Sequence, residues 1–114
     1  MTKRAIGKYW IIHDGRVICD VSDPILDLWR CTRAELIGVN IFDIIPSPEL
    51  RELARLRVNH ILTKGADLHD QDLPVSRPDG TTFWINVITI EIYDGVYLSE
   101  LTYMGEHNPN WHNT

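Results

Sequence analysis

The stretch Arg77-Pro78-Asp79-Gly80-Thr81-Thr82-Phe83-Trp84 carries the clearest topological signal in this chain. Asp79-Gly80 is typical of a tight turn, and residues 81–92 after it are rich in β-branched and aromatic side chains, which favour a strand. Residues 70–77 before the turn also indicate a strand. Pro74 lies within it and cannot donate a ladder hydrogen bond, so we expect an edge position. The pattern predicts an antiparallel strand pair.

A second turn extends this pair toward the C-terminus. Asp94-Gly95 separates residues 81–92 from a final strand predicted over 96–104. Both alternating faces of the last two strands are apolar: Phe83, Ile85 and Val87 on one, and Trp84, Ile88 and Ile90 on the other. A sheet with one face in water shows cleaner alternation. We therefore predict a homodimer through the outer sheet face, involving Trp84 or Tyr97.

The N-terminal part of the chain predicts a hairpin followed by short helices. Residues 9–12 and 17–19 are apolar runs on either side of Asp14-Gly15, which favours a type I′ turn. Thr32-Arg33-Ala34-Glu35 fits a capping box, in which the hydroxyl and the carboxylate each accept a backbone N–H at the helix start. Gly38 predicts the end of that short helix.

A long helix is predicted after residue 46. Ser47 suits the N-cap, Pro48 the first helical position, and Lys64-Gly65 the end. An apolar stripe at about 100° per residue contains Leu50, Leu53, Ala54, Val58, Ile61 and Leu62. The whole chain thus reads as strand, strand, short helices, one long helix and three strands. This order indicates an α+β fold.

Composition limits the class of protein. The chain has 114 residues and 13.2 kDa, with 11 Lys plus Arg against 16 Asp plus Glu and a net charge of −5. This length indicates one domain, and the 44% hydrophobic content excludes disorder. The acidic balance argues against direct nucleic-acid binding, and no apolar run is long enough to predict a membrane span. Two cysteines, Cys19 and Cys31, predict a cytoplasmic protein with small packing thiols rather than disulfides.

Taken together, these motifs resemble those of the PAS domain family. Asp14-Gly15-Arg16-Val17-Ile18 resembles the first hairpin of the family, and the segments 22–29 and 32–38 resemble its helical region. Residues 77–84 are similar to its second signature, a charged residue and Asp-Gly before a Phe-Trp strand. Glu100-Leu101-Thr102 lies where the family often has Asp-Ile-Thr. The resemblance covers residues 8–104.

This resemblance implies a five-stranded antiparallel sheet with short helices and one long helix on one face, enclosing a small cavity. We expect a PAS domain over residues 6–104, an N-terminal extension over 1–5 and an irregular tail over 105–114. PAS domains are usually sensory or dimerisation modules of sensor kinases, cyclases and transcription regulators, working with an output domain or partner protein. Met1 favours an N-terminal or stand-alone position.

The predicted cavity would be lined by side chains of the helices and the inner sheet face. We expect these to include Trp29, Phe42, Arg57, Ile61, Phe83 and Ile85. Arg57 falls within the apolar stripe of the long helix, and three placements are open to it. It could lie at the rim, pair with Glu91 or Asp94, or hold the carboxylate of a ligand.

The resemblance also brings two cofactors into question, flavin and haem. Flavin sensors of the LOV subfamily carry a reactive cysteine in an Asn-Cys-Arg motif, whereas the corresponding residues 39–45 contain neither Cys nor Arg. We therefore expect no LOV-type flavin. Haem-binding relatives place an axial histidine on the long helix. His60 is the histidine available there, but its position at the flank of the stripe predicts a solvated side chain. A colourless small molecule is the remaining ligand class.

Metal and enzyme alternatives have weaker sequence support. Asp67, His69, Asp70 and Asp72 form an acidic cluster, but the spacing lacks the central Gly and terminal Glu of a calcium loop, so we expect no metal site. Small α+β cones of the ketosteroid-isomerase type hold an aspartate base in a cavity of similar size. Asp20 or Asp43 could serve that role, although such folds begin with helices. We therefore expect no enzymatic activity.

Overall fold

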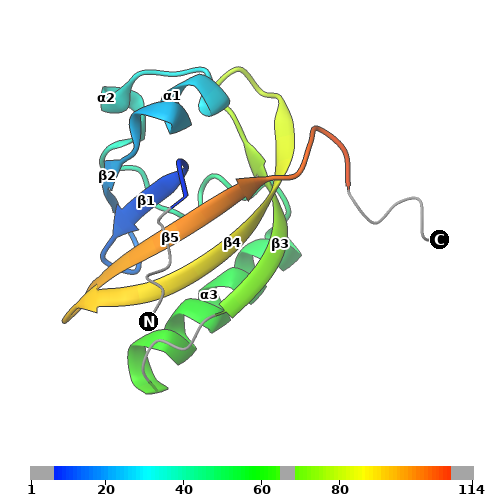
Figure 1. Cartoon of the computed structure of the whole chain (residues 1–114). Coiled ribbons are helices and arrows are strands. Elements are labelled where there is room, and N and C mark those ends of the chain that lie inside the picture. The colour runs from blue at the N-terminus through cyan, green and yellow to red at the C-terminus, as the bar shows by residue number, and fades with distance from the viewer. Residues whose placement is uncertain (1–6, 65–68, 109–114) are drawn as a thin grey trace, which may run out of the picture.

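Five strands form one antiparallel sheet, as predicted, and their order in the sheet is β2-β1-β5-β4-β3 (Figure 1). The computed structural model describes residues 7–64 and 69–108, and the side chains of 61–71 lie outside that description. The strands are β1 (Trp10–His13), β2 (Ile18–Val21), β3 (His69–Ser76), β4 (Thr82–Tyr93) and β5 (Val96–Tyr103). The helices are α1 (Asp23–Trp29), α2 (Arg33–Leu36) and α3 (Pro48–Lys64). The predicted extension over 1–5, Gly65 and residues 109–114 fall outside the described residues.

The two sheet edges follow from the sequence signals. β3 contains Pro74 and is an edge strand, which confirms the prediction. β4 pairs with both β3 and β5, so the two Asp-Gly turns build a three-stranded meander. The first hairpin is confirmed, but its type I′ turn is wrong. Asp14 does not adopt positive φ, and its carboxylate instead accepts the N–H groups of Arg16 and Val17, both at 2.9 Å, across a four-residue loop.

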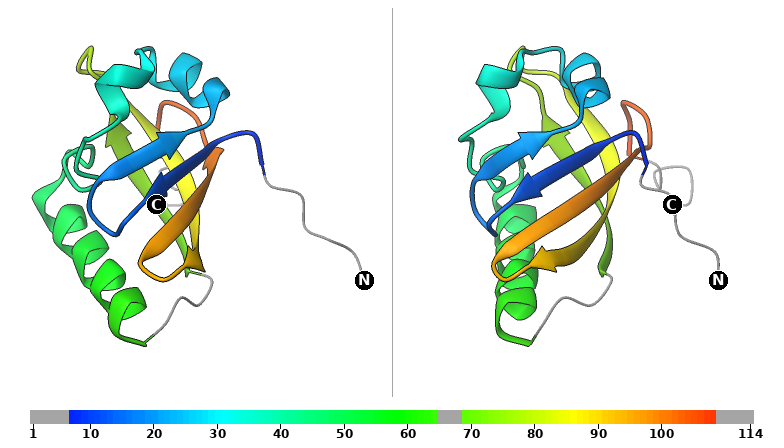
Figure 2. Two further views of the ribbon diagram at one scale, coloured as in Figure 1. Left: turned by 90° about the vertical axis from the view of Figure 1, so that its left-hand side faces the viewer. Right: turned by 60° about the vertical axis from the view of Figure 1, so that its left-hand side comes forward.

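The helices cover one face of the sheet and leave the other open (Figure 2). At α2, the Glu35 carboxylate accepts the Thr32 backbone N–H at 3.0 Å, as the capping box predicts. Gly38 follows the helix with φ of 88°, in the left-handed region that glycine tolerates. The part of the chain that the structure describes contains no helix long and apolar enough to cross a membrane.

α3 begins as predicted, and the Ser47 hydroxyl accepts the Leu50 N–H at 3.3 Å. Its buried stripe is narrower than predicted. Ala54 is buried, whereas Leu53 is 47% exposed, so its assignment to the core stripe is wrong. Adjacent helix positions are rotated by about 100°, and within residues 48–60, whose side chains the structure describes, the sector centred on Ala54 faces the sheet. This part of α3 therefore presents few side chains to the interior.

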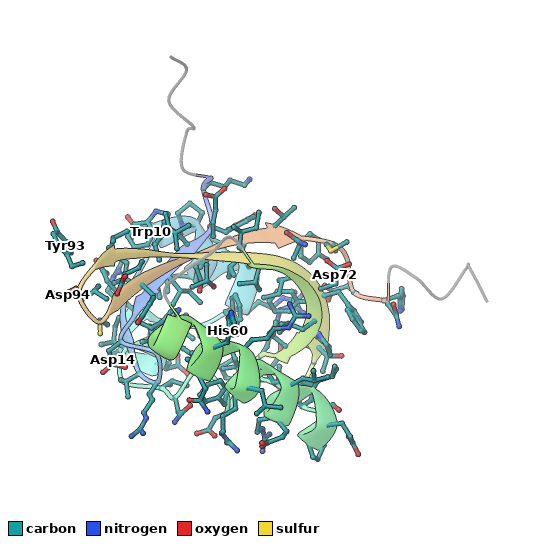
Figure 3. All side chains as sticks on the ribbon, turned by 90° about the horizontal axis from the view of Figure 1, so that it is seen from below. Trp10, Asp14, His60, Asp72, Tyr93 and Asp94 are labelled. Carbon is teal, nitrogen blue, oxygen red and sulfur yellow. The ribbon has the colours of Figure 1, made fainter. Side chains whose placement is uncertain are left out.

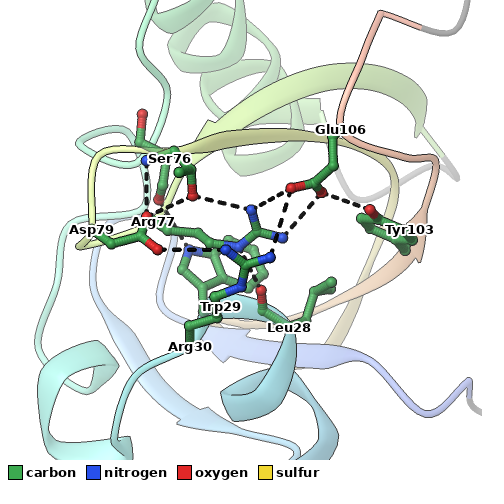
Figure 4. Close-up of polar contacts among 9 residues, drawn as sticks. Leu28, Trp29, Arg30, Ser76, Arg77, Asp79, Tyr103 and Glu106 are labelled. Atoms are coloured by element: carbon green, nitrogen blue, oxygen red, sulfur yellow. Dashed lines mark hydrogen bonds and ion pairs between the residues drawn. The ribbon is translucent and has the colours of Figure 1, made fainter.

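A buried arginine ties the end of the sheet to α1 (Figure 4). Arg77 is 5% exposed and donates from Nε to the Leu28 carbonyl at 2.7 Å. Its two terminal nitrogens donate to both oxygens of Glu106, at 2.7 and 3.1 Å, and Tyr103 donates to the same carboxylate at 2.6 Å. These bonds lower the pKa of Glu106 to about 2. The irregular segment after β5 is therefore anchored through residue 106.

The segment Glu100-Leu101-Thr102 lies within the last strand of the sheet. Glu100, matched above to the aspartate of Asp-Ile-Thr, lies within β5 opposite Trp10 and Ile88. The strand continues to Tyr103, and the carboxylate that binds the buried guanidinium is Glu106, six residues later. β5 thus ends one residue before the predicted end at Met104.

Candidate functional site

A cavity of about 100 Å³ lies between α3 and the inner face of the sheet. Four strands, α1, α3 and the 41–45 loop contribute to its wall. One water needs roughly 10–15 Å³ by this kind of measure, so the space is large enough for several waters or one small organic molecule. Most of the wall is apolar and includes Ile11, Trp29, Phe42, Leu73, Ile85 and Leu101.

The structure brings together most of the side chains that we expected to line a cavity. Trp29, Phe42, Arg57 and Ile85 all border it, although they come from four separate elements. Trp29 is held in place by a hydrogen bond from its indole N–H to the Ser76 carbonyl at 3.1 Å. The side chain of Ile61 falls outside the described residues.

Phe83 does not border the cavity, and the expectation that it would is wrong. It is fully buried at the start of β4, with its ring edge-to-face with Trp29 at 4.8 Å. The Arg77 guanidinium lies 4.3 Å from its ring centroid on the other side. These two neighbours fill the space around Phe83, so it supports the wall rather than forming it.

The polar part of the wall includes a buried hydrogen-bond chain that the sequence did not predict. His13 Nδ1 accepts the Gly15 N–H at 3.1 Å, and His13 Nε2 lies 2.8 Å from Ser99 Oγ. Ser99 Oγ in turn lies 2.8 Å from Thr89 Oγ1. All three side chains border the cavity. They come from β1, β5 and β4, and their registers place them side by side on the inner face.

His13 lies beside the Asp14-Gly15 turn, where a surface position would be usual, but it is only 3% exposed. The ring stacks on Tyr97 with centroids 5.8 Å apart. Burial lowers the pKa of His13 to about 4, against a smaller opposing effect of Asp14. One sequence signal could have indicated that His13 is buried. His13 follows Ile11 by two positions, and side chains two positions apart in a strand lie on the same face of the sheet, here the inner face.

The bonding fixes the protonation state of this histidine. The Gly15 amide can only donate, so Nδ1 must be the acceptor nitrogen of a neutral imidazole. The ring proton is then on Nε2, which donates to Ser99 Oγ. The lowered pKa agrees with this assignment, because the neutral ring is the form that burial favours. His13 therefore presents a donor toward Ser99 at neutral pH.

Arg57 is half-buried on α3 and borders the cavity. Within residues 7–64 and 69–108 it forms no ion pair, so the predicted alternatives with Glu91 and Asp94 are not formed. The Glu91 carboxylate instead accepts the Gly95 N–H at 3.4 Å. Of the three placements predicted for Arg57, the ion pair with Glu91 or Asp94 is therefore excluded within the described residues. The side chain lies beside the cavity instead.

The side chains considered for other chemistry lie elsewhere. His60 is exposed on α3 and does not border the cavity, as its flank position predicts (Figure 3). Asp20 and Asp43 are also exposed, and neither contributes to the wall. Asp20 pairs with Arg33 at 2.9 Å. A base in this cavity would therefore not be either aspartate.

The acidic cluster and the cysteines are also outside the cavity. Asp72 is exposed and accepts a hydrogen bond from Asn86 at 2.8 Å, while Asp67 falls outside the described residues (Figure 3). Among side chains that the structure places, no group of three or more metal-binding residues occurs. Cys31 packs partly against the core, whereas Cys19 is exposed on β2, so its prediction as a packing residue is wrong.

The sheet order, the helical layer and the cavity between them together define an α+β domain with a ligand-sized interior space. A family model described as PAS domain matches residues 8–102, and the chain belongs to this family. The resemblance found in the motifs is thereby confirmed. No curated protein matches the chain significantly.

Solved structures support the same fold. The PAS domain of a LuxR-family transcriptional regulator from Burkholderia thailandensis, in complex with ethanol, is 23% identical, with a TM-score of 0.66 over 84% of this chain and 88% of that one. The PAS domain of the Cronobacter turicensis quorum-sensing receptor RpfR, in complex with BDSF, is 15% identical, with a TM-score of 0.72 over 88% and 97%. A Rhodobacter sphaeroides LOV protein is 16% identical, with a TM-score of 0.74 over 91% and 64%.

Proposed function

We propose that this chain is a cytoplasmic sensory module of a signal-transduction protein, and that it binds a small molecule in the cavity between α3 and the sheet. The observation that carries this proposal is the cavity itself, with an apolar wall and a buried polar chain from His13 to Thr89. Similar domains have been solved with ethanol and with BDSF, which adds support from the family. A sensor kinase, a cyclase or a transcription regulator would supply the output.

Binding would act through α3. Only a narrow sector of this helix faces the interior, and Ala54, Arg57 and Val58 from that sector all border the cavity. A ligand that contacts these side chains and the sheet together would favour one position of the helix over others. Ligands shift such equilibria only through differential contacts, and here those contacts would lie on two separate elements.

Filling the cavity should abolish binding. In the Ala54→Phe variant the added ring would occupy the space, whereas Leu53→Phe places the same ring on the exposed face of α3. We expect small molecules that co-purify with the wild-type chain to be lost from Ala54→Phe and kept by Leu53→Phe, as measured by native mass spectrometry. Equal retention by both variants would contradict the proposal.

We also propose that the outer sheet face forms a homodimer. Trp84 lies on this face, between the inward residues Phe83 and Ile85. Half-buried Ile12, Ile88 and Ile90 surround Leu98 on the same face. Tyr97, the other residue expected at the interface, is 4% exposed and stacks on His13 at the inner face, so that placement is wrong.

A charge on this face should separate the two copies. We expect light scattering of the wild-type chain to give about twice its 13.2 kDa, and Ile88→Glu to give the monomer mass. Leu56→Glu is the matched control, because Leu56 is 57% exposed on α3, and its mass should equal that of the wild type. A monomeric wild-type chain at high concentration would rule out this interface.

A further inference from the structure

The hydroxyl groups of Ser99 and Thr89 at the cavity wall have two hydrogens between them, and only one of these is donated to a hydrogen bond. Ser99 Oγ accepts from His13 and shares a bond with Thr89 Oγ1, and that bond consumes one of the two hydroxyl hydrogens whichever residue donates. The other hydrogen has no acceptor among the side chains and backbone that the structure describes. Ser99 is 7% exposed, so the pair is a buried donor at the cavity wall.

Arg57 is a further polar residue of the cavity wall, and it also offers hydrogen-bond donors. A guanidinium offers five N–H donors and no acceptor, and Arg57 has no carboxylate partner in the described part of the chain. The hydroxyl pair of Ser99 and Thr89 and the Arg57 guanidinium are therefore hydrogen-bond donors on side chains that border an otherwise apolar space. No Asp or Glu borders the cavity within the described residues.

We infer that the cavity selects a small monocarboxylate with an apolar body, an inference that rests on the proposed function and names its ligand class. The carboxylate would accept the spare hydroxyl hydrogen or the Arg57 donors, and the hydrocarbon part would contact Ile85, Leu101 and the other apolar side chains. A neutral molecule with an acceptor would satisfy the hydroxyl pair but not the charge. A hydrocarbon would satisfy neither.

The net charge of the chain does not favour an anionic ligand, so a preference for a carboxylate would have to come from residues at the cavity. The net charge of −5 repels anions at long range, so an anion would be favoured only by groups that touch it. Arg57 is the cation that the structure places at the cavity wall, within the residues described. Removing its charge should thus change the preference for an anion and leave the apolar contacts intact.

Three ligands of nearly equal shape test this inference: benzoate, benzamide and toluene. We expect isothermal titration at pH 7.5 to show benzoate binding at least tenfold more tightly than benzamide, and toluene binding most weakly. Arg57→Met should weaken benzoate about tenfold or more and leave toluene unchanged. Arg16→Met removes an equal charge from an exposed loop residue and should have no effect.

The outcomes separate this inference from the function on which it rests. If benzamide or toluene binds as tightly as benzoate, the carboxylate class is wrong while small-molecule binding stands. If Arg57→Met binds benzoate like the wild type, the inference is wrong as well. If none of the three ligands binds and Ala54→Phe loses no co-purifying molecule, then the proposed function itself fails.

Discussion

Replacing Arg77 with methionine should lower the free energy of unfolding by about 3 kcal/mol. The substitution keeps the apolar contact with Phe83 but removes the donors to the Leu28 carbonyl and to Glu106. Hydrogen bonds that involve a charged group contribute roughly 1.5–3 kcal/mol each. We expect less than the sum, because Glu106 is 39% exposed at its side chain and water can solvate it in the variant.

Urea denaturation of the purified chain measures this change, and Arg30→Met provides its control. Arg30 also faces Asp79 and Glu106, at 3.6 and 4.0 Å, but its side chain is 56% exposed. Exposed ion pairs contribute roughly 0–1 kcal/mol, so this variant should resemble the wild type. Equal losses in both variants would show that the buried position of Arg77 adds nothing.

Acid should destabilise the fold through His13 before the carboxylates titrate. The pKa of His13 is lowered from 6.5 to about 4 in the folded chain, so below pH 6.5 the unfolded chain binds a proton that the folded chain excludes. Stability from this histidine is therefore fully present above pH 6.5 and is lost as the pH falls toward 4. We expect a loss of about 2 kcal/mol between pH 6.5 and 5.

The pH range separates this effect from that of the buried ion pair. The pKa of Glu106 falls from 4.5 to about 2, so its contribution is lost only below pH 4.5. A His13→Gln variant should have a nearly flat free energy of unfolding between pH 6.5 and 5, measured by urea denaturation at each pH. His107 is exposed, and His107→Gln should keep the wild-type slope. A flat profile in the wild type would contradict the assignment of a buried neutral ring.

Sequence reasoning was most successful where local chemistry decides the structure. The Asp-Gly turns and Pro74 predicted the meander and its edge, and Ser47 with Pro48 predicted the start of α3. The cavity wall was partly predictable, because Trp29 and Ile85 follow the inward alternation of a core.

The remaining features depend on contacts between residues far apart in the chain. His13 and its partner Ser99 are separated by 86 positions in the sequence, and the register of β1 with β5 brings them together. Phe83 has the same inward alternation as Ile85, so no local pattern shows that Trp29 shields it from the cavity. Leu53 was predicted to be buried because it belongs to the apolar stripe of the long helix. Such a stripe gives the angle of each side chain around the helix axis, but it does not show how wide a sector of the helix packs on the sheet.

The contact of Arg77 with Leu28 and Glu106 also constrains the order in which the chain is completed during synthesis. The guanidinium joins three points that lie 49 and 29 positions apart in the sequence. A nascent chain emerges from its N-terminus, so Arg77 reaches Leu28 well before its carboxylate partner leaves the ribosome. Until then the charged Arg77 side chain, directly after the end of β3, has only the Leu28 carbonyl and Thr81 as hydrogen-bond partners. Emergence of residue 106 thus closes the domain, and this contact is a late step of folding on the ribosome.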